Sequence, residues 1–505
     1  MSSSSSPDPT TAIERLQDAV TDGRAENIRY RQNQLQSLHA RLREEAGSIC
    51  AALAKDAQSS SAEVEAEYYL AMDAVRHFYD SLNFNEEHEK EYAVTHGKDN
   101  ATRRLGAGLV VIRPTSHTRF YSIVTPLAAA ISAGNCVIVE LQDTLLQVDS
   151  VLRKLLPAAL DVNTFYLTKT ITDSSILETA LLVDQTSASS SPSSITTNSL
   201  TNQLLSSTRS RTVAIVDRTA DIQAAAQAIT NARFGFGGTS PYAPDLVLVN
   251  EFVKQDFFEA CSKYATLAFA RESSVAKKVS GNQSEETRKA VKEAEDRKQV
   301  SSFGSNDFKL IDILDRSTPL MDMKISGRYL PIATCSGLVD AIFTQQFENP
   351  LLAGYFFADP GSAKYLAHHL PCHVSCLNQI PVQLLVGPAA PIAHDADYLY
   401  RYSKAMFSVA RPQYVEPPPE AFVKAAGLLA GDGSKNKITP SAVRALAIQP
   451  LRPTGQPKNE QLGFFEAGFL TMASITLFGI LPIVGYTTWV TSRKAIELAL
   501  RWRHT

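Results

Sequence analysis

The feature that most limits how this chain can fold lies near its C-terminus. Residues 467–490 form an unbroken stretch of 24 residues without a charged side chain. A helix of that length, rising about 1.5 Å per residue, is long enough to cross a hydrocarbon core of about 30 Å. Tyr486 and Trp489 lie near one end, as interfacial aromatic residues do, and Arg493 and Lys494 follow directly. We therefore expect a transmembrane anchor and not a buried core helix.

Two arrangements of this anchor remain open, because Pro482 and several threonines weaken the helix. A single span placed after synthesis, with the large N-terminal part in the cytosol, is expected because the first eleven residues form a Ser/Pro/Thr-rich tail without an apolar signal segment. A hairpin that bends at Pro482 would also keep the basic residues 491–505 in the cytosol, as the positive-inside rule favours. Since unpaired backbone at a bend is costly in lipid, the single span is preferred.

The composition of the whole chain is that of an ordinary globular protein. It is 44% hydrophobic and 20% charged, with a net charge of −3. A charge so close to zero gives no reason to expect nucleic acid as a partner. Six cysteines scattered over 505 residues form no disulfide framework, which indicates a reducing compartment.

The pattern of apolar residues predicts an α/β protein. Short β-branched runs at 109–112 and 136–139 are typical of buried parallel strands. The small-residue segment 126–134 between them predicts a helix that ends at a glycine, so the three pieces form a strand–helix–strand unit of a doubly wound sheet. Helical periodicity is found from residue 12 to about residue 83, and a Ser/Thr-rich loop is expected at 185–211.

Further elements are expected towards the C-terminus. Strands are predicted at 213–216 and 246–249, and a highly charged, solvated helix at 282–299. Many prolines between residues 411 and 463 predict an extended linker with a short helix inside it.

Several of these stretches, taken in order, resemble the aldehyde dehydrogenase superfamily, and in particular its fatty-aldehyde (class 3) branch. Residues 105–112 and 131–139 resemble the family's "PLGVV" strand and "A-AGNAV" turn. Residues 242–245, Tyr-Ala-Pro-Asp, resemble the segment after the family's catalytic cysteine. Between 327 and 353 the chain follows the order of the "FGPILPI", "DEAI" and "PLALY" elements, and the resemblance covers about residues 12–412.

The resemblance implies a Rossmann-like domain with N-terminal helices, a catalytic-like α/β domain and a C-terminal transmembrane helix. The expected divisions are a disordered tail (1–11), the Rossmann-like part (12–212), the catalytic-like part (213–410), a Pro-rich linker (411–466), the transmembrane anchor (467–490) and a basic tail (491–505). That branch includes microsomal members with hydrophobic tails. We therefore expect a cytosolic main domain anchored in the endoplasmic reticulum, with the mitochondrial outer membrane and the peroxisome as alternatives.

The family's catalytic residues are replaced in this sequence. In the family a cysteine thiolate attacks an aldehyde, hydride passes to NAD(P), and a carboxylate activates water. The cysteine position holds Pro241, which has no nucleophilic group, and the adjacent Ser240 lacks a neighbouring base. Cys261 follows 20 residues later, on a helix that we expect to face away. The asparagine that helps to hold the oxyanion corresponds to His117, whose ring is larger and aimed differently.

The family's base and cofactor positions are also replaced. The stretch with the catalytic glutamate corresponds to residues 206–211, which contain no carboxylate. The ribose-binding lysine corresponds to Glu140, a reversal of charge. A second ribose contact, a glutamate, corresponds to Lys324, and its aromatic partner corresponds to Ser326. The phosphate-facing segment 185–194 has no glycine, so no bound cofactor is predicted.

Two other groupings of residues resemble ligand-binding motifs. Five His and Cys residues lie between 368 and 376, but their spacing matches no standard zinc site, and no metal is predicted. The Gly-Phe-Gly-Gly sequence at 235–238 lacks the Lys-Ser/Thr of a phosphate loop and predicts a tight backbone turn.

These observations favour a membrane-anchored pseudoenzyme that acts as a partner or scaffold. Its expected partners are the bilayer and, as a homodimer or heterodimer, a second copy or an active aldehyde dehydrogenase. One alternative is an active NAD(P)-dependent oxidoreductase that oxidises long-chain aldehydes with rearranged groups. The other is a module that binds a small molecule or lipid in the old substrate tunnel.

Overall fold

A computed structural model provides the structure of this chain. It describes residues 9–57, 60–171, 173–186, 203–272, 285–305, 308–345, 350–391, 394, 397–417, 422–423, 439–455 and 462–502. The chain divides into two compact units, one ending at Glu416 and one beginning at Pro417. The first unit extends beyond Arg411, where the linker was predicted to begin, because the amides of Val415 and Glu416 donate to the Asp99 carboxylate.

The first unit begins with helices, as the periodicity predicted. They are α1 (Pro9–Thr21), α2 (Ile28–Glu44), α3 (Ala46–Ala57), α4 (Ser61–Asp80) and α5 (Phe84–Tyr92). Their starts follow local chemistry, because Asn27 caps α2 and a capping box of Ser60 with Glu63 begins α4.

The α/β fold predicted from the sequence is confirmed, and its first sheet is Rossmann-like. Five parallel strands lie in the order β4-β3-β2-β5-β6. They are β2 (Leu109–Arg113), β3 (Cys136–Glu140), β4 (Phe165–Thr168), β5 (Leu181–Asp184) and β6 (Gln203–Leu205), connected in part by α6 (Arg119–Ser132), α7 (Gln147–Ala159) and α8 (Ser174–Thr179). β6 lies in the region predicted to be a Ser/Thr-rich loop. It was missed because its three residues carry no apolar run and form a strand only by pairing with β5.

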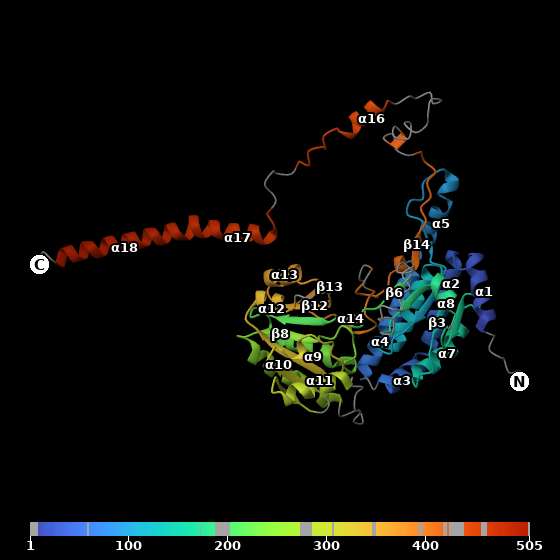
Figure 1. Ribbon diagram of the computed structural model, residues 1–505, viewed down its shortest axis with the longest axis horizontal. Coiled ribbons are helices and arrows are strands. Elements are labelled where there is room, and N and C mark those ends of the chain that lie inside the picture. The colour runs from blue at the N-terminus through green and yellow to red at the C-terminus, as the bar shows by residue number, and fades with distance from the viewer. Residues whose placement is uncertain are drawn as a thin grey trace. The chain divides into compact units, whose positions relative to one another are not determined.

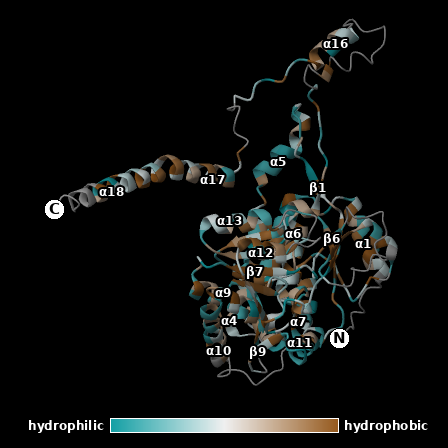
Figure 2. Ribbon diagram, turned by 60° about the vertical axis from the view of Figure 1, so that its left-hand side comes forward, coloured by the Kyte–Doolittle hydropathy of each residue, from teal (hydrophilic) through white to brown (hydrophobic). Residues whose placement is uncertain are grey.

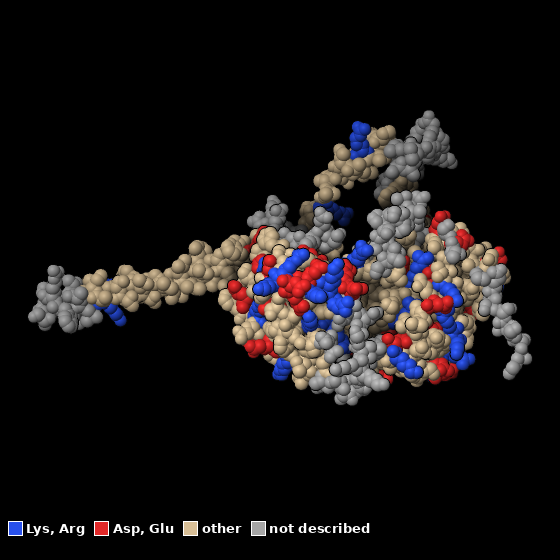
Figure 3. Space-filling view, turned by 60° about the horizontal axis from the view of Figure 1, so that its bottom comes forward, with Lys and Arg blue, Asp and Glu red and all other residues tan. Residues whose placement is uncertain are grey.

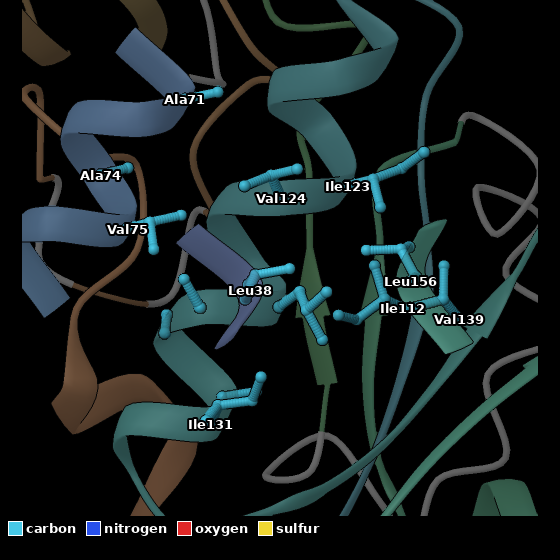
Figure 4. Close-up of a cluster of buried hydrophobic side chains, with 14 of the residues drawn as sticks. Leu38, Ala71, Ala74, Val75, Ile112, Ile123, Val124, Ile131, Val139 and Leu156 are labelled. Carbon is cyan, nitrogen blue, oxygen red and sulfur yellow. The ribbon is translucent and has the colours of Figure 1, made fainter. Parts of the chain in front are cut away.

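A continuous core joins this sheet to the N-terminal helices. Figure 4 shows Leu38 of α2 and Val75 of α4 directed toward Ile123 and Val124 of α6, with Ile112 of β2 on the sheet side. Each of these five side chains has no exposed surface. The apolar face of α6 therefore positions the loop that precedes it, residues 114–118, at the carboxyl edge of the sheet.

Helix α6 begins at Arg119 and not at Pro126, so the predicted helix start was wrong by two turns. Pro126 lies inside the helix, where it has no N–H to donate to the carbonyl of Ser122. That carbonyl accepts instead from the Gln185 side chain, at 2.9 Å. A partner 63 residues away thus makes the internal proline tolerable.

The second sheet has seven strands in the order β13-β12-β7-β8-β11-β10-β9, all parallel except β9. Its strands are β7 (Thr212–Val216), β8 (Leu246–Asn250), β9 (Val300–Gly304), β10 (Lys309–Ile313), β11 (Tyr329–Cys335), β12 (Leu351–Phe357) and β13 (Cys372–Leu377). The helices around it are α9 (Ile222–Phe234), α10 (Lys254–Glu272), α11 (Glu285–Asp296), α12 (Leu338–Thr344), α13 (Pro360–His369) and α14 (Val382–Leu385) (Figure 1). A separate antiparallel pair joins β1 (Arg104–Gly106) to β14 (Ser408–Ala410). The predicted strands at 213–216 and 246–249 and the charged helix near 282–299 are all found.

The second unit contains a short helix, α16 (Pro440–Ala447), and one long helical run. The run consists of α17 (Phe464–Ile475), a π-helical turn (Thr476–Ile480) and α18 (Leu481–Trp502). The π turn lies just before Pro482, whose missing N–H disturbs ordinary helical bonding. The helix continues through Pro482 and does not reverse there.

Much of this long helix is apolar. Its part from Phe464 to Ile496 is long and apolar enough to cross a membrane, and none of its most apolar window is buried. Figure 2 colours much of its ribbon as hydrophobic, and Figure 3 shows uncharged residues along most of its length. The apolar C-terminal helix predicted from the sequence is therefore present.

Candidate active site

Three loops meet at the amino ends of β7, β8 and β11. They are residues 206–211, 235–245 and 324–328. Hydrogen bonds connect the three, because the Thr212 amide donates to Asp245 and the Gly327 amide donates to the Gly238 carbonyl, at 2.7 and 3.0 Å. The structure thus brings together the segments that the resemblance assigned to the base, the nucleophile and a cofactor contact.

Asp245 lies at the centre of this cluster and has no exposed surface. Its carboxylate accepts from the amides of Thr212 and Ile325 and from the Lys324 ammonium, at 2.7, 3.0 and 2.9 Å. Arg233, also fully buried, lies 3.6 Å away. Burial lowers the pKa of Arg233 to about 10 and also lowers the pKa of Lys324, while Asp245 opposes both shifts. One carboxylate therefore compensates two cations.

Lys324 also bonds directly to the loop at the nucleophile position. Its Nζ donates to the carbonyl of Pro241 at 2.5 Å. Two residues further on, the Ser326 amide donates to the Thr287 hydroxyl of α11 at 3.1 Å. The Lys324 side chain and the Ser326 backbone are thus both engaged within the protein.

The Gly-Phe-Gly-Gly sequence forms the tight turn predicted for it. Phe236, Gly237 and Gly238 all have positive φ, at 49°, 66° and 70°. A Cβ on Gly238 would lie 2.3 Å from the Gly327 carbonyl oxygen, so only glycine fits there. The Arg233 guanidinium donates to the carbonyls of both glycines at 2.6 Å, which fixes the two loops against each other.

His117 is enclosed at the end of the loop after β2. Its ring bonds to the Thr239 hydroxyl through Nδ1 and to the Leu385 carbonyl through Nε2, both at 2.9 Å. Burial lowers the pKa of His117 to about 4, so the ring is neutral at pH 7. Because a carbonyl only accepts, Nε2 carries the single ring hydrogen and donates it to Leu385.

None of the nucleophile candidates has thiolate or alkoxide character. Ser240 is buried, and its hydroxyl oxygen accepts from the Tyr242 amide at 3.3 Å. Cys261 lies on α10, within the apolar core of the second sheet, and burial raises the pKa of its thiol strongly. The pKa of every other cysteine is also raised by burial, to about 11 or 12 where the thiol is most enclosed, so none is a thiolate at neutral pH.

The carboxyl edge of the Rossmann-like sheet is where a dinucleotide binds in doubly wound folds. Here Glu140, at the end of β3, is buried and pairs with Arg113, at the end of β2, at 2.8 Å. Its carboxylate also accepts from the Ile171 amide at 3.0 Å. A carboxylate repels a phosphate but can accept from a ribose hydroxyl; here its oxygens are already engaged by Arg113 and by the Ile171 amide.

The segment assigned to the phosphate-facing turn is described only at its start. The Gln185 side chain accepts from the Thr115 amide and donates to Ser122 and Tyr402. Residues 187–194, on which part of the prediction depends, lie outside the described residues. Within the base segment, Arg211 donates to the Met321 carbonyl and to the Gln345 side chain.

No group of three or more His, Cys, Asp or Glu residues is placed to hold a metal ion in the described parts of the chain. The His and Cys residues between 368 and 376 belong to the end of α13 and to β13. A cavity of about 10 Å³ lies elsewhere, lined by Tyr30, Arg31 and Asn135 among others. Its volume is enough for about one water molecule, and the Arg31 Nε has no hydrogen-bond partner among the described residues.

Sequence reasoning missed Arg233 and gave no role to Asp245. A signal existed for the first, because Arg233 stands between Ala232 and Phe234 in a segment otherwise rich in apolar residues. Arg233 donates to the carbonyls of Ile325 and Gly327, about 90 residues away, and no local pattern reveals these contacts.

Comparisons with known proteins agree with the geometry. No protein-family model matches the chain. The dimeric NADP-preferring aldehyde dehydrogenase of Rattus norvegicus is 22% identical over 374 residues, which covers 69% of this chain and 80% of the rat protein. Aldehyde dehydrogenase family 3 member B1 of Mus musculus is 23% identical over 365 residues, covering 67% of this chain and 76% of that protein.

Solved structures show the same fold. The substrate-bound AldH of Staphylococcus aureus superposes with a TM-score of 0.62 at 18% identity, covering 82% of this chain and 95% of the other. Glyceraldehyde-3-phosphate dehydrogenase GapN of Methanocaldococcus jannaschii, complexed with NADP, gives a TM-score of 0.61 at 15% identity over 80% and 93% of the two chains. In sequence, in fold and in the order of its segments, the chain is therefore similar to the aldehyde dehydrogenase superfamily.

Proposed function

We propose that this chain is a membrane-held aldehyde dehydrogenase-fold protein that does not oxidise aldehydes and acts as a binding partner or scaffold. The observation that carries the proposal is the contact between Lys324 and the Pro241 carbonyl. It joins the position of a cofactor contact to the position of the nucleophile. In a working site the residues at these two positions would contact the cofactor and the substrate. Here they bond to each other instead.

Aldehyde oxidation by the family's route first requires a nucleophile, and none of the candidate positions supplies one. Pro241 offers none, and the Cys261 thiol is fully buried with a raised pKa. A serine hydroxyl is a poor nucleophile without a base beside it. The hydrogen bond from the Tyr242 amide to Ser240 supplies no such base.

Stabilisation of an oxyanion lacks a donor as well. The only ring hydrogen of the neutral His117 is donated to the Leu385 carbonyl. An oxyanion hole needs donors that point at the developing charge and are not used elsewhere. The segment at the position of the hydrolytic base carries arginines at 209 and 211 and no carboxylate.

Membrane attachment is the second part of the proposal. A helix that lies in lipid must satisfy its polar groups internally. The hydroxyls of Thr471, Ser474, Thr476, Thr487 and Thr488 all donate to helix carbonyls three or four residues earlier. The helix therefore suits a single span, with the first unit in the cytosol, and the endoplasmic reticulum is the proposed membrane.

The test uses the full-length chain in detergent micelles with NAD⁺ or NADP⁺ and either decanal or hexadecanal. The expected result is no NAD(P)H above the rate of the buffer, while an active aldehyde dehydrogenase added to the same mixture produces it. Turnover that is lost in Cys261→Ala or Ser240→Ala would refute the proposal. It would instead support an active NAD(P)-dependent oxidoreductase, the alternative that the names of the relatives favour.

The partner role has its own test. Co-expression with an active family 3 aldehyde dehydrogenase, followed by cross-linking in the membrane, is expected to give a mixed dimer or a dimer of this chain. Only monomeric chain after cross-linking would contradict a scaffold that works through dimerisation.

A further inference from the structure

The segment before the membrane helix carries apolar side chains that face solvent. Residues 439–455 include α16 and the chain that follows it, and all of them are exposed except the half-buried Val443. Leu446, Ile448 and Leu451 are 46%, 74% and 95% exposed. Figure 2 colours part of the α16 ribbon as hydrophobic. Exposed apolar residues in such a short stretch indicate a surface that contacts something apolar.

The apolar and polar residues of α16 lie on different faces. Val443, Leu446 and Ala447 are spaced at i, i+3 and i+4, so they share one face of the helix. Ala445 lies on the opposite face, because two residues correspond to about 200° of rotation. Arg444 projects beside the apolar face. A short helix of this kind, with a basic residue beside an apolar stripe, is suited to lie in a membrane interface.

The charge of this region has one sign. From residue 433 to residue 459 the sequence holds five basic residues and no acidic one, and the two within the described part are Arg444 and Arg452. The five are Lys435, Lys437, Arg444, Arg452 and Lys458. Figure 3 shows Lys and Arg but no Asp or Glu on the described part of this segment. Basic clusters next to a membrane span are attracted to anionic lipid headgroups.

The length of the chain keeps this segment near the bilayer. Only residues 456–463 separate it from the start of α17. Eight residues extend over at most about 28 Å, which is comparable to the thickness of one leaflet with its headgroups. The segment therefore has the surface of the bilayer within reach whenever the helix is inserted.

We propose that residues 439–455 form a second membrane contact, in which the apolar face of α16 inserts among the lipids and Arg444 and Arg452 bind anionic headgroups. This inference rests on the proposed anchor. It goes beyond the anchor in assigning a lipid-class preference to a separate element. The segment then holds the chain that leads to the first unit flat against the cytosolic leaflet.

The test reconstitutes the full-length chain into vesicles of phosphatidylcholine, with or without phosphatidylserine. An environment-sensitive fluorophore is attached to Ala447→Cys, on the apolar face, or to Ala445→Cys, on the opposite face. Selective labelling is expected because burial raises the pKa of all six native thiols. Only the label at position 447 is expected to brighten, and only with phosphatidylserine. If both labels brighten equally, the whole segment is shielded from water without regard to its faces, and the proposal is overturned.

A charge variant provides the quantitative check. Replacing Arg444 and Arg452 together by glutamine is expected to weaken the phosphatidylserine-dependent docking of the segment roughly 30-fold, at about 1 kcal/mol per basic residue. The headgroup preference would be overturned if the label at position 447 brightened equally in both kinds of vesicle. It would also be overturned if this label did not brighten in either kind although the vesicles carry the chain. A chain that does not float with either kind of vesicle would overturn the anchor, and this inference with it.

Discussion

Replacing Asp245 by asparagine is expected to destabilise the first unit more than any change at an exposed ion pair. The substitution preserves the shape of the side chain but removes the negative charge that faces both Arg233 and Lys324. Removing one partner of a buried ion pair costs about 3–5 kcal/mol, because the other charge stays buried without compensation. The amides of Thr212 and Ile325 donate to different carboxylate oxygens, and asparagine keeps only one of these acceptors, so the loss of one charge-assisted bond, about 1.5–3 kcal/mol, is the lower bound.

Two further variants provide a comparison for this loss of unfolding free energy. Lys324→Met removes a cation and leaves Asp245 with Arg233 and two amides, so we expect a smaller loss, of about 1–2 kcal/mol. Glu295→Gln breaks a partly exposed pair with Lys309, at 2.8 Å, and is expected to cost less than about 1 kcal/mol.

The assay is urea unfolding of the full-length chain in detergent, followed by far-UV circular dichroism. Tryptophan fluorescence is unsuitable, because both tryptophans, Trp489 and Trp502, lie in the C-terminal helix. The reasoning is refuted if Asp245→Asn lowers the unfolding midpoint no more than Glu295→Gln does.

Three further predictions concern pH, cofactor and membrane. Burial raises the pKa of Glu67 from 4.5 to about 7, so the folded state binds its proton more tightly, and stability should fall as pH rises from about 4.5 to about 7; in Glu67→Gln this part of the pH dependence should disappear from thermal melts. Calorimetry with NAD⁺ or NADP⁺ should give no binding in the low micromolar range, because Glu140 and Lys324 are engaged internally, and a tight constant for either nucleotide would contradict this. Alkaline carbonate should leave the full chain in membranes and release a chain that lacks residues 464–505; equal membrane retention of both would rule out the anchor.

The elements that could be predicted from the sequence are those whose formation depends on residues close together in the chain. The strand runs at 109–112 and 246–249 are apolar and β-branched, and the tail helix is uncharged over 24 residues, so short windows suffice. The start of α6 was wrong because a proline is common in the first turn of a helix, and the window contained no sign of the Gln185 bond.

The site was harder to predict for the same physical reason. Substitution at Pro241 and Lys324 was visible once the resemblance was recognised, but their mutual hydrogen bond joins residues 83 positions apart. The buried cluster around Asp245 likewise depends on pairing between separate loops. A sequence reveals that a residue is unusual for its family; only the folded chain reveals what the replacement binds.

The short sheet of β1 and β14 has a mechanical consequence if the chain is tethered at its C-terminus as proposed. The chain leaves the first unit along β14 and residues 411–416, beside β1 and the residues that precede it. A pull from the membrane end therefore acts along this strand pair, and its hydrogen bonds resist the load in shear. The bonds from the Val415 and Glu416 amides to Asp99 are the first to break. Their release lengthens the tether by a few residues while the pairing of Asn100 with Gln413 still protects both large sheets from the force.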